Sequence, residues 1–264
     1  MRRTSLVVLA AALAGASACG SSSSGQAPAA SRTPIAVVLA ASTTTSQAGT
    51  AKVSLDVKSK AGAKAIDING VGAFRLDGSL GSFAVTLNQG SGQPLTLEER
   101  TVGGLLYLKA PPLGDSYYSL KTDALLGTSL GQGTDPTLGL KLLKGASDDV
   151  TVVGQEQVRG EQTTHYKGTY RLRKAVTALG GGFAKAFASQ LTANGDTPVP
   201  FDAYVDKQGR LRKLVQVSTV TVQGQTVTST STTELYDFGA PVDVQAPPAD
   251  KVKDGSVLLK GLSG

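Results

Sequence analysis

Hydrophobic and polar residues alternate with a period of two through most of the chain. The alternation covers residues 50–108 and returns at 150–153, 163–172 and 200–235. In the first stretch Val53, Leu55 and Val57 alternate with polar residues, and turns such as Asp77-Gly78 separate the runs. Successive side chains of a strand point to opposite faces, so the pattern predicts antiparallel strands with one apolar face. We expect about five strands before the middle of the chain and about five after it.

Helical patterns precede and interrupt these strands. Thr33 followed by Pro34 predicts a helix that begins at Pro34 and ends near residue 48. Leu-rich stretches at 120–130 and 136–143 predict two short helices. Apolar residues three or four apart predict a third helix at 174–191, which the glycines at 180–182 should kink or delay. A short helical turn is expected from Pro247 to Lys253. The pattern as a whole indicates one mixed α+β domain.

The first nineteen residues have the layout of a secretory signal. Arg2 and Arg3 precede a short apolar run, which is followed by small residues that end in Ala16-Ser17-Ala18-Cys19. This ending resembles a bacterial lipobox, in which the cysteine is acylated and becomes the new N-terminus. Palmitate is one expected acyl group. The alternative is an ordinary signal peptide cut near Ala18, with Cys19 left as an incidental free thiol.

A small, polar segment follows Cys19 and has little to bury. It is rich in Ser, Gly and Ala, which is typical of a flexible tether. We therefore expect three parts: a signal peptide at 1–18, a lipidated cysteine with its tether at 19–33, and a single folded domain at 34–264. Two or three acyl chains would hold such a protein on the outer face of the cytoplasmic membrane.

Composition excludes several kinds of chemistry. The 264 residues include one Cys and one His, so an internal disulfide framework, a thiolate zinc cluster and a multi-histidine metal site within one chain are ruled out. The formal charge of +6 includes Arg2 and Arg3, and the remaining basic residues are scattered, which argues against nucleic-acid binding. We expect no cofactor and no metal.

Two polar features could still carry chemistry. A hydrolase would have to use His165, which lies in a strand pattern with no nucleophile motif nearby. The simpler interpretation is a strand histidine on a polar face, and we expect no enzymatic activity. Asp148-Asp149 is a carboxylate pair that could bind a cation, but a solvated turn is the favoured interpretation.

Binding of an apolar ligand is the remaining possibility. A curved sheet with helices across its apolar face can enclose a cavity lined by aliphatic residues and Phe. Strand alternation gives eight candidate lining residues, although a dry core would need the same side chains: Ile66, Ile68, Phe74, Phe83, Val85, Leu97, Leu106 and Leu108.

The order of parts resembles the LppX/LprG group of actinobacterial lipoproteins, which are relatives of the LolA-type lipid carriers. Beyond the lipobox and the helix from Pro34, the resemblance rests on four stretches: 158–168, 199–211, Tyr236-Asp237-Phe238-Gly239 and Ala246-Pro247-Pro248. It implies a half-barrel, that is, a curved antiparallel sheet of about ten strands with helices across its concave face. It also implies a hydrophobic cavity for the acyl chains of envelope lipids.

The resemblance indicates a lipid or glycolipid carrier or chaperone. The expected partners are the membrane, through Cys19, and an envelope lipid, with a membrane exporter as a further candidate. The chain is expected to act as a monomer. The alternative is a non-enzymatic structural or sensing surface lipoprotein with a closed core.

Overall fold

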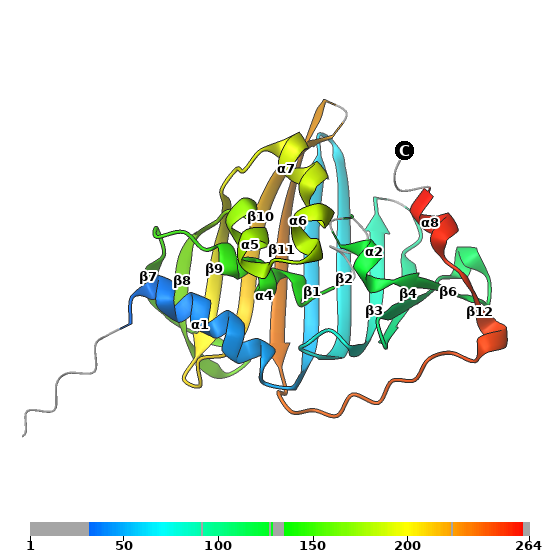
Figure 1. Ribbon diagram of the computed structural model, residues 1–264, viewed down its shortest axis with the longest axis horizontal. Helices are drawn as coiled ribbons and strands as arrows, with labels where there is room; N and C mark the ends of the chain where they lie inside the picture. Colours follow the sequence, from blue (N-terminus) through cyan, green and yellow to red (C-terminus); the bar gives the residue numbers. More distant parts are fainter. Residues whose placement is uncertain (1–31, 91, 127, 129–134, 223, 261–264) are drawn as a thin grey trace, which may run out of the picture. The chain divides into compact units, whose positions relative to one another are not determined.

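The computed structural model describes residues 32–90, 92–126, 128, 135–222 and 224–260. The predicted signal peptide, Cys19 and nearly all of the tether lie outside these residues. The described part contains one sheet of twelve strands (Figure 1). The strands are β1 (Thr50–Ala61), β2 (Lys64–Arg75), β3 (Leu80–Gln89), β4 (Leu95–Val102), β5 (Leu105–Lys109), β6 (Tyr117–Lys121), β7 (Thr151–Val158), β8 (Glu161–Tyr170), β9 (Val199–Asp206), β10 (Leu211–Val222), β11 (Gln225–Tyr236) and β12 (Val252–Asp254).

The sheet is built from two meanders that meet at the centre. Its strand order is β12-β6-β5-β4-β3-β2-β1-β11-β10-β9-β8-β7, so β1 from the first half pairs with β11 from the second. Each neighbouring pair is antiparallel except β12 with β6. The prediction of a largely antiparallel meander is therefore confirmed for both halves.

The expected strand count of about ten was too low by two. The strands missed are β6 and β12, which have five and three residues and lie side by side at one edge. β6 begins before the stretch predicted as a helix from residue 120, and among the described residues of that stretch Thr122–Leu125 (α2) is helical. The tail forms a 3-10 turn at Ala249–Lys251 (η3) and then β12, not a helix to Lys253.

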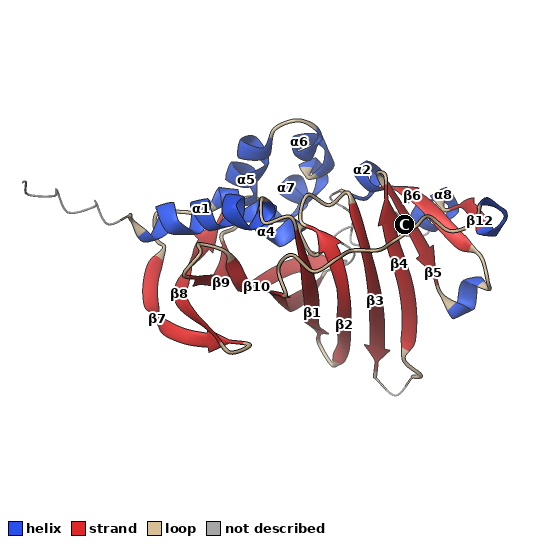
Figure 2. Ribbon diagram, turned by 90° about the horizontal axis from the view of Figure 1, so that it is seen from below, coloured by secondary structure: helices blue, strands red, loops and turns tan. Residues whose placement is uncertain are grey.

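The helices lie on one side of the curved sheet (Figure 2). They are α1 (Pro34–Ser46), α2, α4 (Leu138–Leu142), α5 (Leu172–Leu179), α6 (Gly182–Ala186) and α7 (Ala188–Asn194), with the 3-10 turn η2 at Leu143–Gly145. A further 3-10 turn, η1 (Pro111–Leu113), and α8 (Ser256–Lys260) flank the β6 edge. None of the described helices is long and apolar enough to cross a membrane.

Two helix predictions can be compared directly with the structure. α1 begins at Pro34 with Thr33 as its N-cap, as expected, and the Thr33 hydroxyl accepts a hydrogen bond from the Ala36 amide. The helix predicted at 174–191 is divided into α5, α6 and α7. Gly180 and Gly181 have φ of +64° and +55°, a backbone that disfavours other residues and ends α5.

The core lies between the helices and the concave face of the sheet. It joins α1, α4, α5 and α7 to the inward residues of β1–β3 and β8–β11. Val38, Val53, Phe83, Phe201 and Leu214 are among its fully covered side chains. A smaller cluster of Leu106, Leu120 and Leu125 lies under α2.

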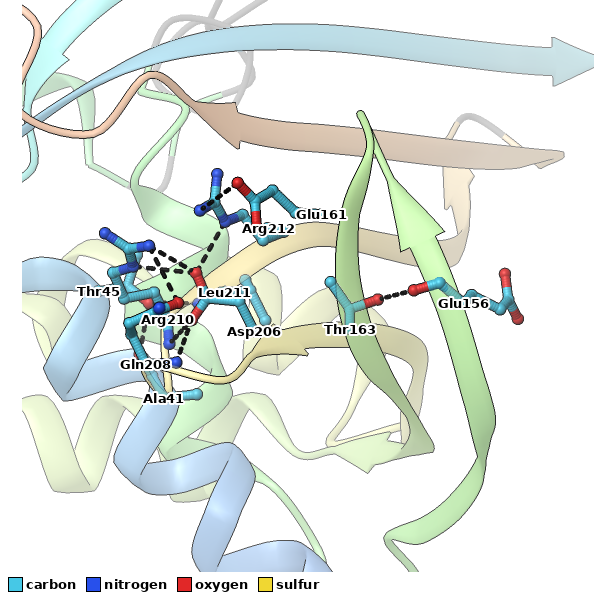
Figure 3. Close-up of polar contacts among 10 residues, drawn as sticks. All are labelled: Ala41, Thr45, Glu156, Glu161, Thr163, Asp206, Gln208, Arg210, Leu211 and Arg212. Carbon is cyan, nitrogen blue, oxygen red and sulfur yellow. Dashed lines mark hydrogen bonds and ion pairs between the residues drawn. The ribbon is translucent and has the colours of Figure 1, made fainter.

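A buried carboxylate holds the β9–β10 hairpin together (Figure 3). Asp206 accepts hydrogen bonds from the Gln208 and Arg210 amides and from the side chains of Arg210 and Arg212, at 2.8–3.0 Å. Burial raises the pKa of Asp206, but the hydrogen bonds from the two arginines outweigh it and keep the pKa below its ordinary value. Both guanidinium groups also lie over the Phe238 ring. The hairpin and Tyr-Asp-Phe motifs of the sequence therefore meet in one structural cluster.

Candidate functional site

The eight predicted lining residues all face the concave side of β2–β5, but they do not form one cavity. Val85, Phe83, Leu106 and Leu108 are at least 95% covered, and Phe83 and Val85 belong to the packed core. Ile68 and Leu97 are partly buried against that core, and Ile66 is 39% exposed. Phe74 and Leu106 line the pocket described below.

Glycines on β2 and β3 let two phenylalanine rings pack directly against the backbone of the concave face. A Cβ added at Gly70 would lie 2.4 Å from the Phe83 ring, and one at Gly81 would lie 2.1 Å from the Phe74 ring. The two rings therefore lie almost on the backbone of the neighbouring strand, where a side chain would otherwise stand. They also meet edge to face, with their centroids 5.5 Å apart. This flat packing leaves space above Phe74.

A pocket of about 260 Å³ lies in that space. Its floor includes Phe74 from β2, Thr101 from β4 and Leu106 from β5. Helices α2, α4 and α6, which lie on this side of the sheet (Figure 2), supply the other apolar walls: Leu125, Leu138 and Phe183. The lining is mostly apolar, which suits a hydrocarbon ligand.

Charged groups stand at the pocket as ion pairs. The Arg75 guanidinium and the Ser79 hydroxyl donate to Asp77 and hold the pKa of Asp77 at about 2. The Lys141 ammonium lies 3.1 Å from Asp135, which also accepts a bond from the Thr137 amide. Asp123 is a further lining carboxylate. The acidic groups at Asp77 and Asp135 are thus balanced by bases from the chain.

Glu99 is an acid in apolar surroundings beside this pocket. It lies on β4 with Phe83 opposite on β3 and Leu108 opposite on β5, and it is only 4% exposed. Its Oε2 atom has no hydrogen-bond partner among the described residues. Burial raises the pKa of Glu99 from 4.5 to about 8. The residue was not among the predicted site residues.

His165 is placed on the opposite, convex face of the sheet. Its Nδ1 lies 3.0 Å from Glu156 and its Nε2 lies 2.7 Å from Asp202, while its ring stacks on Tyr204 at 4.3 Å. Both ring nitrogens are thus engaged by carboxylates, so neither is available to activate a nucleophile. The prediction of a strand histidine on a polar face is confirmed.

The aspartate pair at 148–149 has a structural partner. Asp149 accepts bonds from the amide and the hydroxyl of Thr169, at 3.1 and 2.8 Å. Within the described ranges, no group of three or more His, Cys, Asp and Glu residues is arranged to hold a metal ion.

Two bacterial proteins resemble the chain in sequence. An uncharacterised 31.2-kDa protein of Streptomyces griseus, encoded between rplA and rplJ, is 33% identical over 156 residues. A predicted lipoprotein of Streptomyces coelicolor is 28% identical over 211 residues. These matches cover 54% and 69% of the chain, and 48% and 62% of the relatives, so the chain spans about half to three fifths of their length. No family model matches the chain.

Solved structures with a similar arrangement include two mycobacterial proteins, one of which, LppX, is a lipoprotein. LppX of Mycobacterium tuberculosis has a TM-score of 0.47 and 15% identity, and the match covers 80% of this chain and 98% of LppX. LprF of Mycobacterium bovis has a TM-score of 0.46 and 14% identity, and the match covers 82% of this chain and 97% of LprF.

Proposed function

We propose that the chain is a cell-envelope lipoprotein that binds an acyl chain of a lipid or glycolipid, as carrier or chaperone. The observation that carries this proposal is the mostly apolar pocket above Phe74, between the concave face and helices α2, α4 and α6. Each methylene group shielded there from water contributes about 0.8 kcal/mol, so even part of an acyl chain would be held.

The size of the pocket favours a slender ligand. Its volume of about 260 Å³ lies just below the range of about 300–1,000 Å³ that holds drug-sized molecules. A single acyl chain suits this volume better than several chains bound together. The proposed ligand therefore places one chain between sheet and helices and leaves its headgroup at the charged rim.

The proposed anchor is Cys19, within the lipobox-like sequence Ala16-Ser17-Ala18-Cys19. The S. coelicolor relative is itself described as a lipoprotein, which supports the same assignment here. An anchored carrier would work at the outer face of the cytoplasmic membrane, where its pocket can take lipid from the bilayer.

Lipid extraction tests the proposal. The full chain is purified from host membranes, and its non-covalent lipids are extracted into organic solvent and identified by mass spectrometry. Lipid attached covalently to Cys19 stays with the chain, so the extract reports the pocket. The test variant is Thr101→Phe, which adds a ring to the pocket floor. Its matched control is Thr96→Phe, an exposed residue on the outward face of the same strand.

We expect wild type and the Thr96 variant to carry lipid and the Thr101 variant to lose most of it. Wild-type protein without extractable lipid would overturn the proposal and favour the structural or sensing lipoprotein. Equal lipid in all three proteins would show that the lipid is bound elsewhere.

A further inference from the structure

The site already described leaves one buried group unexplained. Glu99 is 96% covered, and its Oε2 atom has no partner in the part of the chain that the structure describes. Buried polar atoms are almost always hydrogen-bonded, because a buried polar atom without a partner lowers the stability of the fold. An apolar residue at this position would avoid that cost. The unpartnered carboxyl therefore points to a role in binding.

Glu99 lies directly beyond the pocket floor. Thr101 lines the pocket and is two residues further along β4, on the same face, which places its Cα about 7 Å from that of Glu99. On β5, Leu106 lies opposite Thr101 and lines the pocket, and Leu108 lies opposite Glu99. The pocket floor and Glu99 therefore occupy consecutive positions of one surface. Glu99 does not itself line the pocket, so a bound chain would meet it only by extending past Thr101 and Leu106 along β4 and β5.

The surroundings of Glu99 restrict what can bind it. The residues opposite on the neighbouring strands, Phe83 and Leu108, offer no hydrogen bond and no countercharge. Burial without a countercharge favours the neutral acid, which can both donate and accept a hydrogen bond. An alcohol has the same two capacities, and it brings no second charge into an apolar site. An ammonium group would require two desolvated charges, which is costly without further polar groups.

We infer that Glu99 is the polar contact of the lipid site and that the ligand carries a hydroxyl group along its acyl chain. This inference rests on the proposed function and specifies its ligand class: hydroxylated acyl chains rather than plain ones. The apolar pocket holds the chain, and Glu99 selects among chains by pairing with the hydroxyl.

Binding of matched lipids tests the inference. The delipidated full chain is titrated by displacement of a fluorescent long-chain acyl probe. The competitors are methyl octadecanoate and its monohydroxy derivatives, with the hydroxyl at carbon 2, 3, 10 or 12, because the depth of Glu99 along the chain selects the isomer. A single well-made hydrogen bond makes the best isomer bind about tenfold more tightly than methyl octadecanoate.

Three variants test whether Glu99 causes the preference for the hydroxylated ester. Glu99→Leu fits the apolar surroundings and should remove the tenfold preference. Glu99→Gln keeps both hydrogen-bonding capacities and should retain most of it. Glu98→Gln, on the outward face of the same strand, should leave it unchanged. Far-UV circular dichroism checks that each variant is folded.

The outcomes separate this inference from the proposed function. If methyl octadecanoate and all hydroxy isomers bind equally, the site binds acyl chains but the inference is wrong. A preference that persists in Glu99→Leu also overturns it, because another group then supplies the contact. If wild type binds neither the acyl probe nor any acyl ester, the proposed function fails and the inference fails with it.

Discussion

The buried acid on β4 should make the stability of the protein depend on pH in a specific window. In the unfolded chain Glu99 ionises near pH 4.5, and in the folded chain burial raises its pKa to about 8. Between these pH values the folded chain holds a proton that the unfolded chain releases. The free energy of unfolding must therefore fall as pH rises through this range, and level off above about pH 8.

The magnitude follows from the two pKa values. The free energy of unfolding falls by about 1.4 kcal/mol for each pH unit in the window. Over the whole window the loss is therefore roughly 5 kcal/mol at most. The neighbours on the concave face do not add to this effect. Phe83 and Leu108, which lie opposite Glu99 on the neighbouring strands, do not titrate. A loss of even half this size is a large share of a typical domain stability.

The assay is urea unfolding of wild type and Glu99→Gln at several pH values from 5 to 9. Far-UV circular dichroism reports unfolding, because the chain contains no Trp. The difference in unfolding free energy, variant minus wild type, removes the contribution of every other group. We expect this difference to rise with pH across the window by several kcal/mol.

Glu98, the neighbouring acid on the outward face of β4, should affect the pH dependence of stability in the opposite direction. Burial raises the pKa of Glu98, but hydrogen bonds from Arg100 and Tyr117 outweigh it and place the pKa below its ordinary value. The stability that Glu98 contributes is therefore present at neutral pH and lost only on acidification. A flat difference curve for Glu99→Gln between pH 5 and 8 would refute the burial argument for Glu99.

Two further substitutions test other parts of the structure. Asp206→Asn should lower the free energy of unfolding at neutral pH by about 3–5 kcal/mol, because the buried Arg212 and the partly buried Arg210 lose their closest countercharge. By comparison, Asp237→Asn should lower the free energy of unfolding in urea far less, because its ion pair with Lys52 is exposed to solvent. Gly81→Ala should push the Phe74 ring into the pocket, cost about 1–3 kcal/mol and reduce extractable lipid, whereas Gly154→Ala, with open space around its Cβ, should do neither. Unchanged lipid in the Gly81 variant would contradict this account of the pocket floor.

The period of two in the sequence was sufficient for the sheet but not for the pocket. Alternation placed Phe74, Phe83 and Leu106 on one face correctly, because successive side chains of a strand point to opposite faces of the sheet. Whether a residue on that face meets a helix or a void depends on which helix lies across it. α6 is separated from α5 by Gly180 and Gly181, and it carries Phe183 to the pocket wall. Sequence spacing alone predicted a single helix at 174–191, kinked or delayed by its glycines, and not three separate helices.

Glu99 could have been found from the same alternation. Leu95 and Leu97 are inward, and the next residues at a spacing of two are Glu99 and Thr101. Leu97 was the only candidate lining residue predicted on this strand, and a charged residue is rarely buried without a partner. That rule holds for a charge, whereas a carboxyl among apolar neighbours can remain neutral. An acid that continues an apolar alternation is therefore best treated as an inward, uncharged hydrogen-bonding group. At Glu99 this interpretation links the pH dependence of stability to ligand choice, because the same neutral form is needed for both.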